Sequence, residues 1–475
     1  MTTAYAKHEH HEFLAAANEA LHNANLQLAL SQLGDTLGQR NKAAFAALEC
    51  SAELRERARA IKNATLASLD EHLATLADAV ERRGGQVHFA ADAEDACRIV
   101  TQIAREENVR RVVKSKSMTT EEIHLNPALE KAGIEVVETD LGEYIIQLAQ
   151  QRPSHLVAPA IHMRIKEIAE TLSRAAGHPL PEEPTELTAF ARRALREKFA
   201  TADMGITGAN FAVAETGTIV VVSNEGNARL TTTLPRVHVA IVGMEKVIPK
   251  LAHLPVFLKI LARAATGQKL SVYTSIISGP RRGGELDGPE KFHLVLLDNG
   301  RSRILGSPLR ESLFCIRCGA CLNACPVYRN IGGHAYGGVY AGPIGAVLTP
   351  LYDGLVANEH LPHASSLCGA CQAACPVKIQ IPQMLIQLRE ALHETPERHG
   401  RLERLAYRFW AASLRSGRRY RIGSWLASRT LGLAFRQQRW LKTLPGKLAG
   451  WTDERDFPAP APRRFRDWWK KEGQA

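Results

Sequence analysis

The sequence predicts an α/β protein in which N-terminal helices precede an α/β domain with a largely parallel sheet. A helical domain and a basic helical C-terminal region follow. Apolar runs alternate with helical stretches from about residue 63 to residue 300, seven of nine cysteines lie between Cys315 and Cys375, and all six tryptophans follow Arg398. With 475 residues, 45% of them hydrophobic, the chain suits two or three domains. We expect four segments: 1–62, 63–300, 301–395 and 396–475.

The N-terminal segment does not resemble an export signal. Such a signal needs a basic start and an apolar core, whereas residues 8–12 read His, Glu, His, His, Glu. The longest uncharged run, residues 335–352, contains four glycines and two prolines, which suit a membrane-spanning helix poorly. We therefore expect a cytoplasmic chain without a transmembrane segment.

Short apolar runs are the candidate strands of the α/β domain. They cover residues 86–90, 111–114, 134–138, 155–158, 211–214, 218–223, 237–242, 269–274 and 291–297. Helix-like segments such as 92–107 and 120–131 separate them, which is typical of an α/β domain with a largely parallel sheet. Ligands of such sheets bind in the loops at the carboxyl ends of the strands.

Three groups of polar residues are expected in such loops. Lys114, Ser115 and Lys116 follow a strand and open a helix, where ammonium groups, hydroxyls and free N–H groups can hold a carboxylate or phosphate. The second group comprises residues 205–210, which precede a strand, and the turn 215–218; the third comprises residues 224–229. Gly, Asn and Thr are also ordinary turn residues, so a purely structural role is the alternative for each group.

Sequence signatures for a nicotinamide or flavin cofactor are missing. No dinucleotide fingerprint follows the first strand, and no phosphate-binding loop or serine-hydrolase elbow occurs. If the chain moves electrons, we therefore expect another subunit to supply or remove the electron pair.

The cysteine spacing indicates the class of protein. Cys315, Cys318, Cys321 and Cys325 precede Pro326 in the pattern C-x2-C-x2-C-x3-C-P, which is the spacing of bacterial ferredoxins. Three cysteines of such a motif bind one iron–sulfur cube, and the fourth reaches a neighbouring cube. One motif therefore implies a second cluster.

A second motif, one cysteine short, supplies the remaining ligands. Aligned by the C-P pair, Cys368, Cys371 and Cys375 take its last three positions and Ser365 takes the first. The predicted ligands are Cys315, Cys318, Cys321 and Cys375 for 4Fe-4S cluster 1, and Cys325, Cys368 and Cys371 for 4Fe-4S cluster 2. For the fourth position of cluster 2, Ser365, water and a partner protein all stay open, as does a three-iron cluster. The 42 residues between the motifs favour a helical two-cluster domain over the compact two-hairpin ferredoxin.

Disulfides and zinc are the alternatives for these cysteines. Disulfides fit badly, because nothing indicates an oxidising compartment and the cysteines are too closely spaced to staple a long chain. Zinc would normally show two C-x2-C pairs, or cysteines with histidines. Cys50 and Cys97 are isolated, and we expect them to be small buried residues.

The C-terminal segment differs from the rest of the chain in charge. From Arg398 onward the net charge is +13, whereas residues 1–397 sum to −2. Basic residues interleaved with tryptophan suit an acidic partner protein or the inner anionic face of a membrane, as a peripheral contact. Packing of the apolar residues on the main body is the alternative. Nucleic acid is not expected, because no recognised reading motif accompanies the charge.

Several segments together resemble a known family. They are residues 205–231 (GITGANFAVAETGTIVVVSNEGNARLT), residues 114–117, CIRCGACLNACPVY and SLCGACQAACPVKI, and they resemble lactate-utilisation protein B, an iron–sulfur protein. The resemblance implies a ribose-isomerase and CoA-transferase-like α/β domain followed by a helical two-cluster ferredoxin. It also implies electron transfer in oxidation of L-lactate to pyruvate, with companion subunits A and C. Glu215 lies in a loop like that of the CoA-transferase nucleophile, but one chain establishes no equivalence and we name no catalytic residue.

Three functional hypotheses follow. The first is an electron-relay subunit of a dehydrogenase-type complex that oxidises L-lactate, with an unknown downstream acceptor. In the second, the α/β domain itself oxidises a 2-hydroxy acid and holds its carboxylate with Lys114, Lys116 or Arg229. The third is a redox-sensing module whose clusters regulate partner docking.

Overall fold

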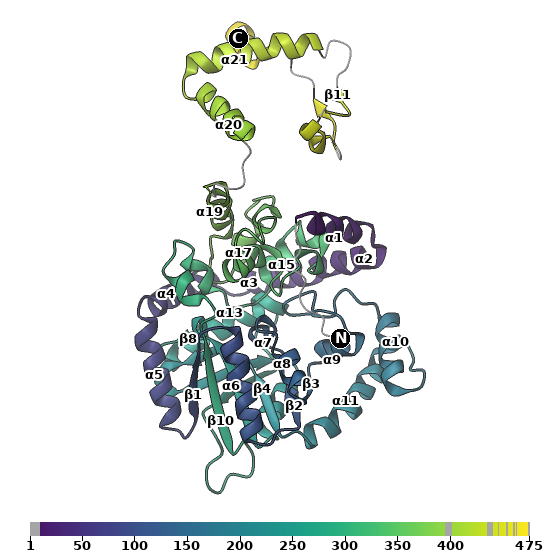
Figure 1. Cartoon of the computed structure of the whole chain (residues 1–475), viewed down its shortest axis with the longest axis vertical. Coiled ribbons are helices and arrows are strands. Elements are labelled where there is room, and N and C mark those ends of the chain that lie inside the picture. Colours follow the sequence, from purple (N-terminus) through teal and green to yellow (C-terminus); the bar gives the residue numbers. More distant parts are fainter. Residues whose placement is uncertain are drawn as a thin grey trace. The chain divides into compact units, whose positions relative to one another are not determined.

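The computed structural model describes residues 10–394, 401–434, 440–444, 446–452, 455–458, 461 and 463–473 (Figure 1). The chain divides into two compact units, Met1–Leu392 and His393–Ala475. Within the described residues, no helix is both long enough and apolar enough to cross a membrane. The boundaries of the four segments expected from the sequence stay predictions.

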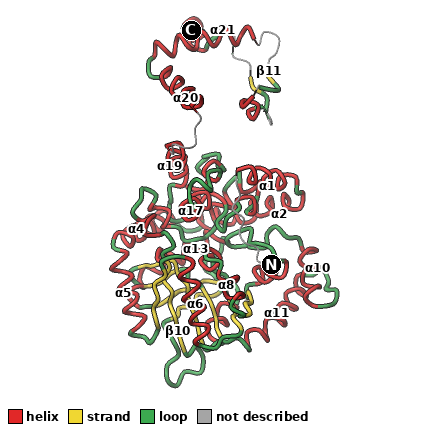
Figure 2. Tube along the Cα trace, viewed as in Figure 1, coloured by secondary structure: helices red, strands yellow, loops and turns green. Residues whose placement is uncertain are grey.

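A six-stranded parallel sheet forms the centre of the first unit, and its strand order is β1-β10-β7-β4-β2-β3. A second sheet of four strands has the order β8-β5-β6-β9. Figure 2 shows the strands in yellow. The strands are β1 (Gln86–Ala90), β2 (Arg111–Lys114), β3 (Glu135–Glu138), β4 (Met204–Thr207), β5 (Phe211–Val213), β6 (Thr218–Ser223), β7 (Val237–Gly243), β8 (Val247–Ile248), β9 (Tyr273–Ile277) and β10 (Lys291–Leu297). The prediction of an α/β domain with a largely parallel sheet is confirmed.

Helices precede, cover and follow these sheets. Those up to β4 are α1 (His10–His22), α2 (Ala24–Leu33), α3 (Gln39–Ala46), α4 (Ser51–Ala67), α5 (Leu69–Glu81), α6 (Ala93–Glu106), α7 (Met118–Glu122), α8 (Leu125–Lys131), α9 (Leu141–Ala149), α10 (Ile165–Ala176) and α11 (Pro184–Ala200). Those after β6 are α12 (Asn227–Thr233), α13 (Leu254–Thr266), α14 (Arg301–Leu305), α15 (Ala320–Ala324), α16 (Tyr328–Ile331), α17 (Gly342–Asp353), α18 (Ala370–Ala374) and α19 (Ile381–Glu394).

Both faces of the parallel sheet are buried, which explains why its central strands are continuous apolar runs. All seven residues of β7 are buried. Val239 and Ile241 face α6 and α8, whereas Ala240 and Val242 face the core shared by the second sheet, α5 and α13. The layers are therefore helices, parallel sheet, second sheet and helices.

Four expectations about local structure were wrong. Residues 155–158 form no strand, because the segment packs against the cysteine region: the buried His155 ring contacts Asn323 (3.1 Å). Residues 205–207 lie within β4 rather than before a strand. The helix expected over 120–131 is interrupted at His124, whose backbone is left-handed (φ 52°). Cys50 is exposed and Cys97 is half-buried.

One strand lies at another position than the sequence predicted, and one glycine has another role. β9 runs over Tyr273–Ile277, whereas the sequence predicted a strand over 269–274. It lies at the edge of the second sheet, where it pairs with β6. The glycine at 205, which suggested a turn, allows close packing instead. A Cβ there would overlap the carbonyl oxygen of Thr231 on α12.

The N-terminal helices join the α/β domain to the cysteine region. α1 and α2 pack against α16, while α3 and α4 pack against α13. Gln27 on α2 donates to the carbonyl oxygen of Asn330 (2.6 Å). Phe13 on α1 packs edge-on against Tyr336. The N-terminal helices thus contact both the α/β domain and the cysteine region.

The second unit is helical and basic, and its tryptophan side chains are exposed. Its helices are α20 (Arg401–Leu414), α21 (Gly417–Ala434) and α22 (Phe465–Glu472), with a short strand pair, β11 (Trp440–Leu441) and β12 (Phe457–Pro458). The exposed fractions of the six tryptophans range from 39% for Trp468 to 62% for Trp410. The expected basic helical region is thus present.

Candidate metal centre

Four cysteines from the two motifs line one cavity. Cys315, Cys318 and Cys321 come from the first motif, and Cys375 comes from the second. Most of the other lining residues are apolar: Leu156, Ile316, Ile344, Val377, Ile379 and Ile381. The structure thus brings together the four residues that the crossover rule assigned to cluster 1, in surroundings that limit the access of water.

The remaining three cysteines form a second group. Burial, together with the negative charge of the neighbouring Cys325 and Cys368, raises the pKa of Cys371 to about 11. Packing of α15 against α18 holds the two motifs side by side. Cys368 is exposed, whereas the other six motif cysteines are buried. The second group therefore lies nearer the surface than the first.

The sulfur atoms are placed to carry negative charge. Backbone N–H groups donate to three of them: Arg317 N to Cys315 Sγ (3.4 Å), Tyr328 N to Cys325 Sγ (3.5 Å) and Ile379 N to Cys375 Sγ (3.4 Å). Burial nevertheless raises the pKa of the Cys318 and Cys321 thiols strongly, because a buried thiolate needs a compensating cation. Soft thiolate donors around an apolar cavity fit an iron–sulfur cluster.

A single zinc ion is the alternative occupant for closely spaced cysteines. Among the residues that the structure describes, no three His, Cys, Asp or Glu side chains are grouped so that they could hold one metal ion. A tetrahedral zinc site gathers all its ligands on one ion. An iron–sulfur cube places each cysteine on a different iron, so its ligands stand farther apart.

Residues outside the motifs support the cysteine backbone. Arg55 on α4 donates through Nη2 to the carbonyl oxygens of Cys375 (2.6 Å) and Ala373 (2.7 Å). Leu156, next to the buried His155, lines the cavity itself. These contacts join residues far apart in the chain, and no pattern in the sequence predicts them.

A buried ion-pair network adjoins the first cysteine group. Arg301 binds Glu122 through Nη1 (2.8 Å) and Nη2 (2.9 Å), and binds Glu245 through Nε (2.5 Å). Arg317, within the first motif, lies 3.6 Å from Glu245 and stacks on the Tyr340 ring at 4.5 Å. Burial alone would raise the pKa of Glu245, but the charges of Arg301 and Arg317 lower it to about 2. The network thus connects the α/β domain to the loop that carries the cysteines.

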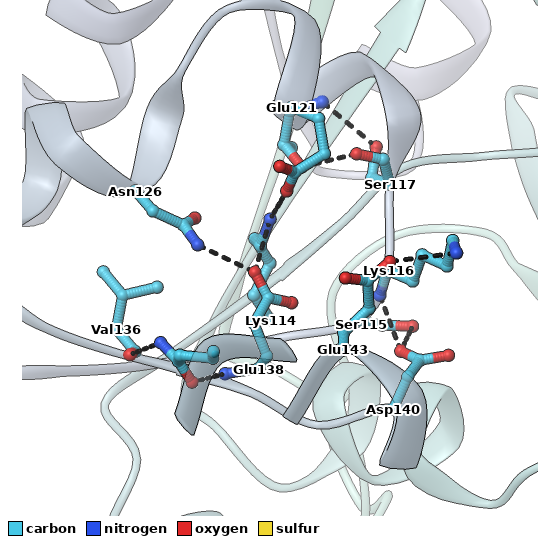
Figure 3. Close-up of polar contacts among 12 residues, drawn as sticks. Lys114, Ser115, Lys116, Ser117, Glu121, Asn126, Val136, Glu138, Asp140 and Glu143 are labelled. Atoms are coloured by element: carbon cyan, nitrogen blue, oxygen red, sulfur yellow. Dashed lines mark hydrogen bonds and ion pairs between the residues drawn. The ribbon is translucent and has the colours of Figure 1, made fainter. Parts of the chain in front are cut away.

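A second polar network lies at the carboxyl ends of β2 and β3, and Figure 3 shows its contacts. The Nζ atom of the fully buried Lys114 lies 2.8 Å from Glu121 Oε1 and 2.7 Å from Glu138 Oε1. Burial alone would lower the pKa of Lys114, but the two carboxylates outweigh it and raise that pKa. Lys116 pairs with the buried Glu143 at 2.9 Å. Both lysines are therefore paired with carboxylates of this chain.

Two of the three predicted loop groups meet at this network. Asp140 accepts from Lys116 N (2.7 Å) in the first group and from Asn227 Nδ2 (2.7 Å) in the third. Glu215, from the second group, is exposed in the turn between β5 and β6 and accepts from Leu251 N (2.9 Å). Arg229 is exposed on α12. The expected cluster of loops around one cleft is thus only partly formed.

Replacing Glu138 with glutamine is expected to change how stability depends on pH. Burial raises the pKa of Glu138 to about 7, from 4.5. Between pH 4.5 and 7 the folded state therefore holds the extra proton, and this carboxyl makes the free energy of unfolding fall as pH rises. We expect Glu138→Gln to remove that fall. Relative to the parent chain, its free energy of unfolding should therefore rise by about 1–3 kcal/mol between pH 5 and pH 8.

Urea unfolding at pH 5 and at pH 8 measures this change in the free energy of unfolding. Glu135→Gln is the matched control, because Glu135 lies on the same strand in surface ion pairs with Arg111 and Lys198, and its pKa is lowered. Equal pH profiles for Glu138→Gln and the parent chain would contradict the prediction.

Fold and donor set together define an iron–sulfur protein built from an α/β domain and a ferredoxin-type cysteine region. Three family models match the chain: the LUD domain at residues 73–297, the 4Fe-4S dicluster domain at 311–379 and the C-terminal region of lactate utilisation protein B at 386–474. The chain belongs to the lactate utilization protein B family.

Curated relatives cover nearly the whole chain. Lactate utilization protein B of Shouchella clausii is 49% identical over 425 residues, covering 89% of each chain. Lactate utilization protein B of Anoxybacillus flavithermus is 45% identical over 463 residues, covering 97% of this chain and 98% of that one. Among solved structures, a DUF162 family protein from Deinococcus radiodurans is 15% identical, with a TM-score of 0.29, and covers 48% of this chain and 98% of that one.

Proposed function

We propose that this chain is the iron–sulfur electron-transfer subunit in the oxidation of L-lactate to pyruvate. The observation that carries the proposal is the convergence of Cys315, Cys318, Cys321 and Cys375 on one buried cavity. Cys325, Cys368 and Cys371 would hold a second 4Fe-4S cluster beside it. Bound clusters supply one-electron chemistry, which a two-electron substrate oxidation needs in order to feed a single-electron carrier.

The chain's own residues serve this relay by position and by exclusion of water. Ile316, Val377 and Ile379 shield the first group, and backbone N–H groups donate to the sulfurs, which stabilises their negative charge. The second group reaches the surface at Cys368, which is exposed. We therefore place the exchange of electrons with other proteins at that edge.

The polar network supports placing lactate oxidation in another subunit. A 2-hydroxy acid oxidised by this chain would need a cation to hold its carboxylate. Of the three cations named for this role, Lys114 and Lys116 are engaged by carboxylates of the chain itself, and Arg229 is exposed on α12. We propose companion subunits A and C as partners, with the basic C-terminal region as a contact for an acidic protein or for the inner membrane face.

Reduction of the chain by lactate is expected only in the presence of companion subunits. The chain is purified anaerobically, and iron and sulfide per protein are measured; we expect about eight irons. Electron paramagnetic resonance spectra are then recorded before and after L-lactate is added, with and without subunits A and C.

Each other outcome has a definite meaning. Reduction of the isolated chain by lactate would place the oxidation in its α/β domain, and zinc instead of iron would overturn the cluster assignment. Rapid reversible reduction without loss of iron would argue against a sensor that works by cluster breakdown.

A further inference from the structure

The two cysteine motifs share one backbone conformation. Arg317 and Leu367 each precede the second cysteine position of their motif, and both are left-handed, with φ of 58° and 54°. Gly319 and Gly369 follow that cysteine with φ of 75° and 81°. A five-residue helix comes next in each motif, α15 or α18. The motifs are therefore structural repeats in which Ser365 corresponds to Cys315.

Ser365 makes the same local hydrogen bond as its counterpart. Cys315 Sγ accepts from the backbone N–H of Arg317 at 3.4 Å, and Ser365 Oγ accepts from the backbone N–H of Leu367 at 3.2 Å. A left-handed backbone is uncommon for arginine or leucine and carries a steric cost, yet both motifs adopt it. The conformation thus places the first donor atom of each motif, sulfur in one and oxygen in the other, in the same local position.

The Ser365 backbone is anchored from a neighbouring helix. Arg389 on α19 donates through Nη2 to the Ser365 carbonyl oxygen (3.3 Å) and through Nε to the Pro362 carbonyl oxygen (2.8 Å). Ser365 is half-buried, whereas the adjacent Ser366 is exposed. Arg389 thus anchors the backbone of Ser365, whereas the exposed Ser366 hydrogen-bonds through its side chain to Cys368.

We propose that Ser365 Oγ is the fourth ligand of cluster 2. Binding forms an iron–oxygen bond while the hydroxyl proton leaves to solvent, so Ser365 coordinates as an alkoxide. This inference rests on the proposed function, because it presupposes that Cys325, Cys368 and Cys371 hold a cluster. A hard oxygen anion favours the more oxidised iron, so cluster 2 has a lower reduction potential than an all-cysteine cluster at that place would have.

Two substitutions at Ser365 test the assignment, with Ser31→Ala as the control, because Ser31 is exposed on α2 and lies outside both motifs. Ser365→Cys supplies a sulfur in the same place. We expect about eight irons, changed paramagnetic g values for cluster 2 and a higher potential for cluster 2 alone in a redox titration. Ser365→Ala removes the ligand. We expect iron to fall from about eight to about seven after mild oxidation, with the appearance of a three-iron signal.

The outcomes separate this inference from the proposed function. A parent chain without clusters defeats the proposed function itself. A parent chain with about eight irons, combined with unchanged spectra and potentials in both Ser365 variants, overturns only the ligand assignment. If Ser365→Ala assembles no cluster 2 at all, Ser365→Cys decides: recovery of about eight irons supports a donor atom at position 365, and failure to recover them overturns the assignment. Ser31→Ala should match the parent chain in every measurement.

Discussion

Replacing Cys375 with alanine is expected to remove the same cluster as replacing Cys318, although the two cysteines belong to different motifs. Both line the buried, mostly apolar cavity, where water cannot replace a lost ligand, so loss of either should remove cluster 1 entirely. Cys325→Ala and Cys371→Ala should instead both remove cluster 2. In each variant we expect iron to fall from about eight to about four per chain and electron transfer from lactate to fall to background.

Spectra of the reduced variants test this pairing. Two reduced clusters in one domain couple magnetically, so each variant should lose the coupling and retain the signal of one cluster. The signal left in Cys375→Ala should equal that in Cys318→Ala and differ from that in Cys371→Ala. Cys50→Ala is the control, since Cys50 is exposed and lies outside both motifs. If Cys375→Ala grouped with Cys371→Ala, the crossover assignment would be wrong.

Local patterns predicted those parts of the molecule that depend on neighbours in sequence. The strands β2, β6 and β10 were expected with their observed bounds, because each is a short apolar run. Cysteine spacing similarly indicated the donor set, since a loop that wraps a cube must place its sulfurs at fixed intervals. Both features are set by the chain within about a dozen residues.

Structural features that depend on residues distant in the sequence were not predicted. β4 was expected to be a loop because glycine, here Gly205, is a common turn residue. In the structure Gly205 lies within the strand, and its lack of a side chain lets α12 pack closely against β4. The segment around His155 looked like a strand, but the backbone N–H groups of Val157 and Ala158 donate to Nδ1 of the His155 ring instead of to a neighbouring strand. Nε2 of that ring contacts Asn323. Lys114 was expected to offer a free charge, and the sequence did not indicate that Glu121 and Glu138 would enclose it.

Replacing Arg301 with methionine is expected to destabilise the first unit by about 3–5 kcal/mol, because breaking a buried ion pair leaves an uncompensated charge in the interior. The guanidinium is fully buried and holds the buried carboxylate of Glu245 as well as that of Glu122, and it stacks on the Tyr352 ring at 5.0 Å. Urea unfolding at pH 7 measures the loss. Arg98→Met is the control: its pair with Asp95 is exposed and should be worth at most about 1 kcal/mol.

Acid should narrow the difference between Arg301→Met and the parent chain. The folded-state pKa of Glu245 is lowered from 4.5 to about 2, so its ion pairs stabilise the parent chain above pH 4.5, and this contribution is lost as pH falls toward 2. In Arg301→Met the carboxylates of Glu122 and Glu245 have lost their main cation and protonate more readily. Acid therefore lowers the free energy of unfolding of this variant less than that of the parent chain. Adding Glu122→Gln and Glu245→Gln should restore part of the loss at pH 7, because no buried carboxylate is then left without its cation. A triple variant no more stable than Arg301→Met would instead indicate that packing of the arginine, rather than its charge, stabilises the junction between the α/β domain and the cysteine loop.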